Sequence, residues 1–233
     1  MNEKPELKVD WCTYKAAKYA CINWHYSGCM PCGKLFKIGV WEDSIYIGCV
    51  LYGRGANLHI GMPFGLEQIE CCELVRIALN NHITPVTQIV AKSLNMLKVT
   101  NKNMRLIISM ADPEQNHHGG IYQAGNWIYI GKTKAQSNCI YKGKIMHKRS
   151  AMAKFGTTTG LKFSKKLWKH KYLMPLDKKM RRQIIKLSKP YPKKTCPEGV
   201  TGSTSGFQPE GIGSSPISGL KPIKTGEVNG DAK

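Results

Sequence analysis

The stretch from Ala111 to Gly131, ADPEQNHHGGIYQAGNWIYIG, determines the fold that the sequence predicts. The apolar run 106–110 precedes it and a second apolar run, 127–130, ends it, so the predicted order is strand, polar turn, short helix, strand. Asp112 stands where the first strand ends. Because ligands bind at the carboxyl ends of strands in open α/β sheets, we expect a site at this turn.

Four side chains of the turn and the short helix could perform acid-base chemistry or bind a metal. They are Asp112, His117, His118 and Tyr122. A carboxylate, two imidazoles and a phenol within eleven residues favour a functional cluster. The alternative is structural: Asp112 and Pro113 form a turn, the glycines relax the backbone, and Tyr122 packs in the core.

The remaining periodicity predicts an α/β fold with a mixed central sheet flanked by helices. The predicted strands are 36–41, 45–52, 69–79, 106–110, 127–130 and 169–176, and the predicted helices are 12–24, 85–97, 145–155 and 177–187. The apolar segment 69–79, which contains Glu73 and Arg76, fits a helix or a strand, and we favour a strand. Asp177 is the expected N-cap of the last helix.

The positive charge of the chain is concentrated in one segment. Residues 132–196 hold 20 Lys and Arg and one acid, a balance of +19, whereas residues 1–131 carry a balance of +2. A solvated basic face explains a few lysines, but this density favours a polyanionic partner. Interleaved aromatic residues suit stacking on bases as well as phosphate contacts, so we expect double-stranded DNA rather than a lipid surface. The predicted DNA-binding residues are Lys148, Arg149, Lys165, Lys166, Lys169, Arg181 and Arg182.

These patterns divide the chain into three parts. Residues 1–131 form the core, residues 132–196 form a basic DNA-binding segment that also completes the fold, and residues 197–233 form a disordered tail rich in Gly, Ser and Pro. The sequence has no run of about 18 apolar residues and no signal-peptide pattern, so we expect no membrane segment and a cytoplasmic location. A homodimer is compatible with the sequence.

The nine cysteines suggest reduced thiols rather than a disulfide framework. Four of them, Cys12, Cys21, Cys29 and Cys32, are spaced irregularly for a structural zinc site, and we interpret most of them as buried small apolar residues.

Two further features are candidates for a site. His25 and Tyr26 follow the first helix just before Gly28, where they either cap it or face a pocket. Arg76 lies inside an apolar segment, and a buried guanidinium needs an anionic partner, which Glu73, Asp112 or a substrate could supply. The sequence contains no Walker A, GxSxG or HExxH motif.

The order of elements and the segment with Asn116, Tyr122 and Asn126-Trp127 resemble the N-acetyltransferase superfamily known as GNAT. More closely, the chain resembles the Mom-type DNA-modification enzymes of phages. The features that carry this resemblance are His25-Tyr26, the strand with Arg76, and Asp112 ten residues before Tyr122, and it covers about residues 12–176. Those enzymes transfer a methylcarbamoyl (acetamido) group to N6 of adenine, which protects phage DNA from restriction.

The resemblance implies roles for these residues. The implied catalytic residues are Asp112, Tyr122, His25, Tyr26 and Arg76. Asp112 would orient or deprotonate the amine, Tyr122 would act as an acid or a ligand, and Arg76 would hold an anionic group. The resemblance also implies iron, bound by His25, Tyr26, Asp112 and Tyr122, because mixed nitrogen and oxygen ligands suit that metal. Since N6 of adenine is paired and stacked in a duplex, the base would have to be flipped out.

The chain departs from the acetyltransferase pattern at one place. The motif Gln/Arg-x-x-Gly-x-Gly, which binds the pyrophosphate of coenzyme A, is replaced by residues 80–85, NNHITP, which contain no glycine. We therefore do not expect acetyl-CoA as the donor, and the sequence leaves the donor open. Two alternatives remain: an acyl-CoA N-acyltransferase acting on a small molecule or protein, and a nucleic-acid-binding protein without enzymatic activity.

Overall fold

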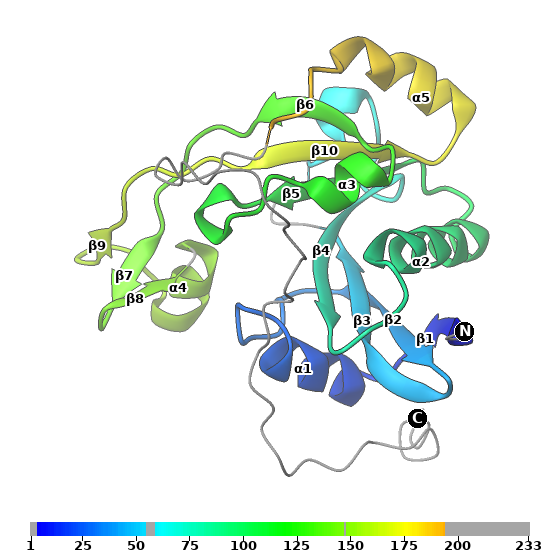
Figure 1. Cartoon of the computed structure of the whole chain (residues 1–233). Coiled ribbons are helices and arrows are strands. Elements are labelled where there is room, and N and C mark those ends of the chain that lie inside the picture. The colour runs from blue at the N-terminus through cyan, green and yellow to red at the C-terminus, as the bar shows by residue number, and fades with distance from the viewer. Residues whose placement is uncertain (1–3, 55–58, 147, 194–233) are drawn as a thin grey trace, which may run out of the picture.

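The structure, a computed structural model, describes residues 4–54, 59–146 and 148–193 (Figure 1). A seven-stranded sheet with strand order β1-β2-β3-β4-β5-β10-β6 forms the centre of this part of the chain. β4 and β5 run parallel, and the other neighbouring strands run antiparallel. The strands are β1 (Leu7–Trp11), β2 (Leu35–Glu42), β3 (Ile45–Gly53), β4 (Cys71–Leu79), β5 (Leu106–Ala111), β6 (Ile128–Lys132) and β10 (His170–Pro175).

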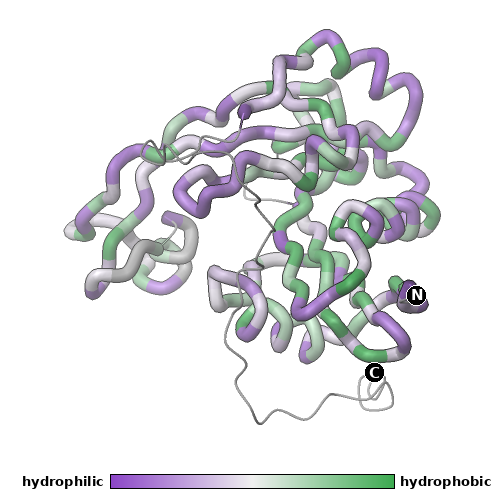
Figure 2. The backbone as a smooth tube through the Cα atoms, viewed as in Figure 1, coloured by the Kyte–Doolittle hydropathy of each residue, from purple (hydrophilic) through white to green (hydrophobic). Residues whose placement is uncertain are grey.

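Helices α1 (Tyr14–Asn23) and α2 (Val86–Thr100) cover opposite faces of this sheet. Alternate side chains of β3 point to opposite faces of the sheet, and both faces are apolar. Cys49 and Leu51 pack in the cluster with α1, whereas Val50 and Tyr52 pack in the cluster with α2. Both sets are fully buried. Figure 2 shows hydrophobic residues concentrated along the central strands. The main core therefore lies on the two faces of β2, β3 and β4.

The edge of the sheet beyond β5 is formed by β10 and β6, and two short elements connect β5 to β6. The 3-10 turn Pro113–Gln115 and helix α3 (Gly120–Ala124) connect these strands. β10 then lies between β5 and β6 and pairs with both. Thus a strand of the predicted basic segment is an internal strand of the main sheet, between β5 and the edge strand β6.

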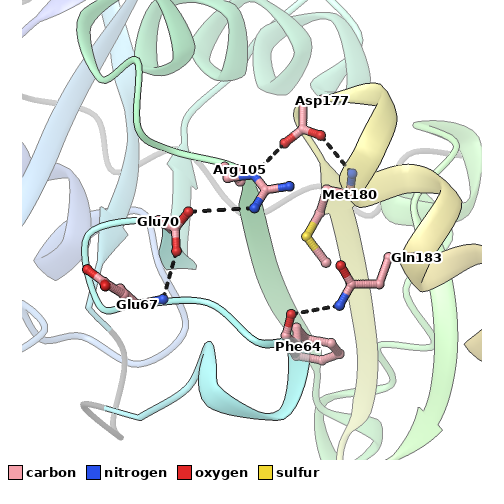
Figure 3. Close-up of polar contacts among 7 residues, drawn as sticks. All are labelled: Phe64, Glu67, Glu70, Arg105, Asp177, Met180 and Gln183. Atoms are coloured by element: carbon pink, nitrogen blue, oxygen red, sulfur yellow. Dashed lines mark hydrogen bonds and ion pairs between the residues drawn. The ribbon is translucent and has the colours of Figure 1, made fainter.

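Helix α5 (Lys178–Ile184) is attached to the sheet by a small polar network (Figure 3). The Asp177 carboxylate accepts a hydrogen bond from the N–H of Met180 at 2.7 Å and so caps the helix, as the sequence predicts. Arg105 Nε lies 2.8 Å from the same carboxylate, and an Arg105 guanidinium nitrogen lies 3.6 Å from Glu70. Gln183 donates to the carbonyl of Phe64. This network ties the helix to the start of β5.

A second sheet lies apart from the first, at the opposite end of the molecule from α5 (Figure 1). Its strands have the order β8-β7-β9, and helix α4 packs beside them. The elements are β7 (Cys139–Tyr141), β8 (Lys144–Met146), α4 (Lys148–Phe155) and β9 (Lys162–Phe163). We call these four elements the basic lobe.

The structure confirms the mixed sheet, its flanking helices and all six predicted strands, with shifted ends. Segment 69–79 forms a strand from Cys71, as favoured. The helix predicted over 145–155 is wrong at its start, because 144–146 form β8 and α4 begins at Lys148. The physical reason is the turn Lys142-Gly143, where both residues have positive φ and close a hairpin. The sequence did not predict β1, β7 or β9. The predicted disordered tail, 197–233, lies outside the described residues.

Candidate functional site

The site begins where two parallel strands separate. β4 and β5 pair from Cys71–Leu106 to Leu74–Ser109. Beyond this point β4 continues to Leu79 paired with β3 only, and β5 continues to Ala111 paired with β10 only. At this fork the Ser109 hydroxyl donates to the Leu74 carbonyl at 3.2 Å and lies 2.8 Å from the Tyr122 hydroxyl. The fork therefore places backbone groups of β4 and the phenol of α3 next to each other.

A β-bulge at Val75 gives Arg76 its direction. Leu51 of β3 faces Arg76 and Tyr52 faces Leu74, so Val75 is an extra residue of β4. A bulge of this kind reverses the alternation of side chains. Leu74 packs in the cluster with α2, and beyond the bulge the even-numbered Ala78 packs in the cluster with α1. Arg76 is thereby turned toward the side of the sheet that α1 covers.

Arg76 is partly buried, and its side chain has an unused donor. One guanidinium nitrogen donates to the Val75 carbonyl at 3.3 Å. The Nε atom is buried and has no hydrogen-bond partner among the described residues. A buried N–H group without an acceptor destabilises the folded state by roughly 1–3 kcal/mol, whereas an N–H group at the surface is hydrogen-bonded to water. Such a donor suits an oxygen acceptor on a bound molecule.

His25 and Tyr26 follow α1, and His25 lies close enough to Arg76 for their charges to interact. Burial, together with the smaller effects of the charges on Arg76 and His117, lowers the pKa of His25 to about 4. The His25 ring stacks on Tyr26 with ring centroids 4.1 Å apart, and Tyr26 meets the edge of His117 at 5.5 Å. His25 is therefore neutral at pH 7, and the turn with His117 contacts the ring of Tyr26, which remains 58% exposed.

Tyr122 is buried, and its ring packs against Trp127 and Tyr172 at centroid distances of 5.0 and 5.1 Å. Burial raises the pKa of Tyr122 to about 12; the hydrogen bond to Ser109 opposes this rise, and Tyr26 is among the groups that add to it. Its phenol is thus protonated at neutral pH. The packing interpretation and the functional interpretation are both compatible with this position, since the ring is in the core and the hydroxyl is at the fork.

Asp112 has a different environment from the other predicted catalytic residues. Its carboxylate accepts a hydrogen bond from the N–H of Glu114 at 3.1 Å and lies 2.9 Å from Nζ of Lys169. Within the described ranges, no hydrogen bond or ion pair joins it to the other four residues. Asp112 is therefore the anionic partner of Lys169 and not of Arg76.

The turn between Asp112 and α3 is held against β10 by close packing. Gly119 has φ +86°, and a Cβ at this position would collide with the Tyr172 ring. The Tyr172 hydroxyl donates to the His118 carbonyl, and the Gln123 amide donates to the same carbonyl and to the carbonyl of Pro192. Only glycine fits position 119, which explains the first glycine of the Gly119-Gly120 pair.

Three of the four predicted iron ligands have a polar atom in another contact. Nδ1 of His25 lies 2.8 Å from the hydroxyl of Ser27, the Tyr122 hydroxyl bonds Ser109, and Asp112 pairs with Lys169. In the part of the chain that the structure describes, no three His, Cys, Asp or Glu side chains are grouped to hold a metal. This arrangement does not fit the ligand set, and iron stays a prediction on which no step below depends.

The prediction that most of the four N-terminal cysteines are buried apolar residues is right for one of them, partly right for a second and wrong for two. Cys21 is buried in the cluster with α1, and Cys12 is partly buried. Cys29 and Cys32 are exposed, because they lie in the loop after α1 and not in an element of the core.

The loop before α2 binds a carboxylate of the chain itself through its backbone N–H groups. The buried Glu42 carboxylate accepts hydrogen bonds from the N–H groups of Ile83 at 3.0 Å and Thr84 at 2.6 Å. Although burial raises the pKa of Glu42, these hydrogen bonds bring it below its usual value. The N–H groups of residues 83 and 84, in the segment that replaces the pyrophosphate motif, therefore already hold an anion. Sequence reasoning missed Glu42 because 41 residues separate it from Ile83.

The predicted DNA-binding residues fall on two separate surfaces (Figure 1). Arg181 and Arg182 are exposed on α5. Lys148 is exposed on α4, with Nζ 5.0 Å from the ring centroid of Phe163. Arg149 also belongs to α4, although its side chain is outside the description. Lys165 and Lys166 are exposed and Lys169 is partly buried, all three between the basic lobe and β10, and Lys165 lies 3.4 Å from Glu114.

The sheet, the fork and the polar groups around it define a mixed α/β protein with a site at the ends of two diverging strands. The sequence model of the Mom protein family matches residues 6–193, and the chain belongs to this family. The family predicted from His25-Tyr26, Arg76, Asp112 and Tyr122 is thus confirmed.

Two solved structures resemble the chain at low sequence identity. One is a ribosomal-protein-S5-alanine acetyltransferase from Vibrio fischeri, with 11% identity, a TM-score of 0.46, and coverage of 76% of this chain and 96% of that chain. The other is FeeM, an N-acyl amino acid synthase from uncultured soil microbes, with 10% identity, a TM-score of 0.46, and coverage of 78% and 96%. No curated protein sequence matches the chain. Among the described residues, no helix is both long and apolar enough to span a membrane.

Proposed function

We propose that the protein is a transferase that adds a methylcarbamoyl (acetamido) group to N6 of adenine in double-stranded DNA and thereby protects the DNA from restriction. The observation that carries this proposal is the direct link between the candidate site and the basic segment. Lys169 and Lys165 pair with Asp112 and Glu114, which belong to the turn at the end of β5. Membership of the Mom family supports the same reaction.

The reaction forms a bond between N6 of adenine and a carbon of the transferred group, and it breaks the bond between that carbon and the leaving group of the donor. N6 loses one proton and the leaving group gains one. Tyr122, with a pKa of about 12, keeps its proton at neutral pH and can donate it or a hydrogen bond to the leaving group. Arg76 can bind an oxygen of the donor through its unpartnered Nε.

Asp112 is the group that accepts the N6 proton. As long as Lys169 lies 2.9 Å from it, the ammonium competes for the carboxylate. A phosphate of bound DNA is an alternative partner for Lys169, because ammonium groups bind phosphates as readily as carboxylates. DNA binding would then release the carboxylate for proton transfer. In this way the basic segment both binds the duplex and frees the Asp112 carboxylate to act as the general base.

The target adenine has to leave the duplex before N6 can react, which costs a few kcal/mol. Phosphate contacts from Lys148, Lys166 and neighbouring cations would offset that cost. Phe163 is 47% exposed within this cationic surface and can stack on a base. The donor stays open, and the Glu42 contacts with Ile83 and Thr84 support a donor other than acetyl-CoA.

Nucleoside mass spectrometry tests the proposal. Plasmid DNA from cells that express the protein is expected to contain an adenine heavier by one methylcarbamoyl group and to resist restriction. DNA from cells that express the Tyr122→Phe variant at the same level is expected to lack it. Unmodified DNA with the wild-type protein, in a host where the protein is folded and abundant, would overturn the proposal.

A further inference from the structure

Strand β1 lies at one edge of the main sheet and has an open side (Figure 1). In the part of the chain that the structure describes, no strand pairs with that side. The Glu6 carbonyl accepts from the N–H of Asp43, and the Cys12 N–H donates to the carbonyl of Lys37, so the even-numbered residues hydrogen-bond to β2. In an antiparallel ladder the residues between them direct their backbone groups to the other side. The open edge therefore presents the backbone groups of Leu7, Val9 and Trp11.

The side chains of β1 alternate between an apolar face and a charged face. Leu7 and Val9 pack against the cluster with α2, and Trp11 follows on the same face with 41% of its surface exposed. Lys8 and Asp10 project from the opposite face, and their side chains are 62% and 52% exposed. Both faces of the strand thus continue to the open edge.

The sequence of β1, LKVDW, is complementary to itself in antiparallel pairing. When two copies pair about Val9, each Lys8 stands opposite Asp10 of the partner subunit, and each Leu7 stands opposite Trp11 of the partner subunit. The two Val9 residues form a hydrogen-bonded pair, because Val9 directs its N–H and C=O groups to the open edge. The Lys8–Asp10 pairs are then of the other type, in which side chains lie closest together. Opposite charges and apolar groups in such positions stabilise a sheet.

A groove beside the open edge can receive the exposed indole. It is lined by residues 6–9 and, from α2, by Ala91, Lys92, Asn95 and Met96. In the antiparallel pair the partner's Trp11 stands opposite Leu7 on the face that α2 covers, and so reaches this groove. Lys92 donates to the Leu7 carbonyl at 3.0 Å, and a carbonyl with two lone pairs can also accept from the partner strand. The Trp11 N–H, which now donates to the exposed Asp10 carboxylate, is the donor for that bond.

We infer that the protein forms a symmetric dimer in which β1 pairs antiparallel with β1 of a second copy and the two main sheets become continuous. A second copy is the favoured occupant of this edge, because a two-fold axis brings each residue of one strand opposite its complement in the other. An open edge strand is a template for such pairing. The interface consists of one short strand and one groove from each subunit, so the dimer should be weak and in exchange with the monomer.

Sedimentation velocity of the full chain, purified free of nucleic acid, measures the association. We expect wild-type protein to pass from monomer to dimer between about 1 and 100 µM, the range of a weak interface. Lys8→Asp gives β1 two acids and Asp10→Lys gives it two lysines, so like charges oppose each other in either homodimer. Each variant alone should associate at least tenfold more weakly than wild type. An equimolar mixture of the two should dimerise as wild type does, because every facing pair is again of opposite charge.

The control is Lys134→Asp, which makes the same charge change at an exposed lysine just beyond β6, the other edge strand of the sheet. This variant should associate as wild type does. Melting temperatures should be similar in all variants, because Lys8 and Asp10 are exposed. Wild-type protein that stays monomeric at about 100 µM would overturn the inference. A dimer that both single variants retain, or a mixture that stays as monomeric as its components, would overturn it as well.

None of these measurements depends on DNA modification. Failure of the dimer and failure of the proposed function are therefore distinguishable: the first is seen in sedimentation and the second in the nucleosides of plasmid DNA.

Discussion

Nζ of Lys169 lies 2.9 Å from the carboxylate of Asp112, so a residue predicted to bind DNA and a residue predicted to act in catalysis form one ion pair. The Lys169 side chain is 44% exposed and the Asp112 side chain 19% exposed. A pair that is this accessible contributes little to stability. Its importance is that the lysine can exchange one anion for another, which couples the DNA surface to the site.

The first prediction concerns the charge of Asp112. Asp112→Asn keeps the shape of the side chain and removes its ability to accept a proton, so base modification should be abolished while DNA affinity stays within about twofold of wild type. Nucleoside mass spectrometry measures the first quantity and fluorescence anisotropy the second. Glu114→Gln is the matched control, because Glu114 also pairs with a lysine of the basic segment. Normal modification in Asp112→Asn would exclude Asp112 as the base.

The second prediction separates the packing role of Tyr122 from its chemical role. Tyr122→Phe removes the hydroxyl that bonds Ser109, and Tyr52→Phe removes a buried hydroxyl that bonds Ser93 at 2.7 Å. Each loss should cost about 1 kcal/mol of stability, seen as a similar drop in melting temperature. Modification should fall at least a hundredfold in Tyr122→Phe and remain near normal in Tyr52→Phe. If both variants keep their activity, Tyr122 is a core residue only.

Local patterns were sufficient for the fold and for part of the site. Alternating and apolar runs located the six predicted strands, and Asp177 was recognised as a cap because its signal lies within three residues of Met180. Tyr122 was nominated from its position in one loop and helix. The hairpin at Lys142-Gly143 has a local signal too, since its positive φ values need a glycine-containing turn.

The remaining features depend on residues that are distant in sequence. The pair Lys169–Asp112 joins β10 to the end of β5, and the Val75 bulge is defined by its register with β3. No periodicity within one segment encodes such relations, because they are set by which strands become neighbours. For the same reason the sequence left Arg76 with several candidate partners and did not show that Asp112 is paired elsewhere.

The third prediction is a pH dependence of stability from Glu42. Its folded pKa is lower than its unfolded pKa, which is about 4.3, since the N–H groups of Ile83 and Thr84 stabilise the carboxylate. The stabilisation is therefore complete above pH of about 4.3 and is lost as the pH falls through the folded pKa. Glu42→Gln should lower stability by roughly 1.5–3 kcal/mol at pH 7, by less near pH 3.

Thermal unfolding at several pH values measures this difference between Glu42→Gln and wild type. Comparison with wild type is needed because Asp177, whose pKa is also lowered by Arg105, makes the whole protein sensitive to acid. A difference that stays constant from pH 7 to pH 3 would mean that the charge of Glu42 does not hold the loop before α2.

The fourth prediction tests the two cationic surfaces with DNA. Lys165 and Lys169 pair with acids, so replacing them also frees Glu114 and Asp112 and mixes two effects. Lys148→Ala/Lys166→Ala on one surface and Arg181→Ala/Arg182→Ala on α5 avoid this. Because each phosphate contact contributes about 0.9 to the slope of log affinity against log salt, each double variant should reduce the slope by about two units. Binding should weaken similarly for all sequences, since phosphate contacts carry no base information.

The control for this prediction removes two charges elsewhere. Lys98→Ala/Lys102→Ala changes two exposed lysines outside the basic segment, at and just beyond the end of α2, and should leave the slope unchanged. Anisotropy titrations of one duplex at several salt concentrations give all four slopes. If the control lowers the slope as much as the other variants, the effect comes from net charge and not from phosphate contacts. If only one surface changes the slope, a single duplex does not reach both the basic lobe and α5.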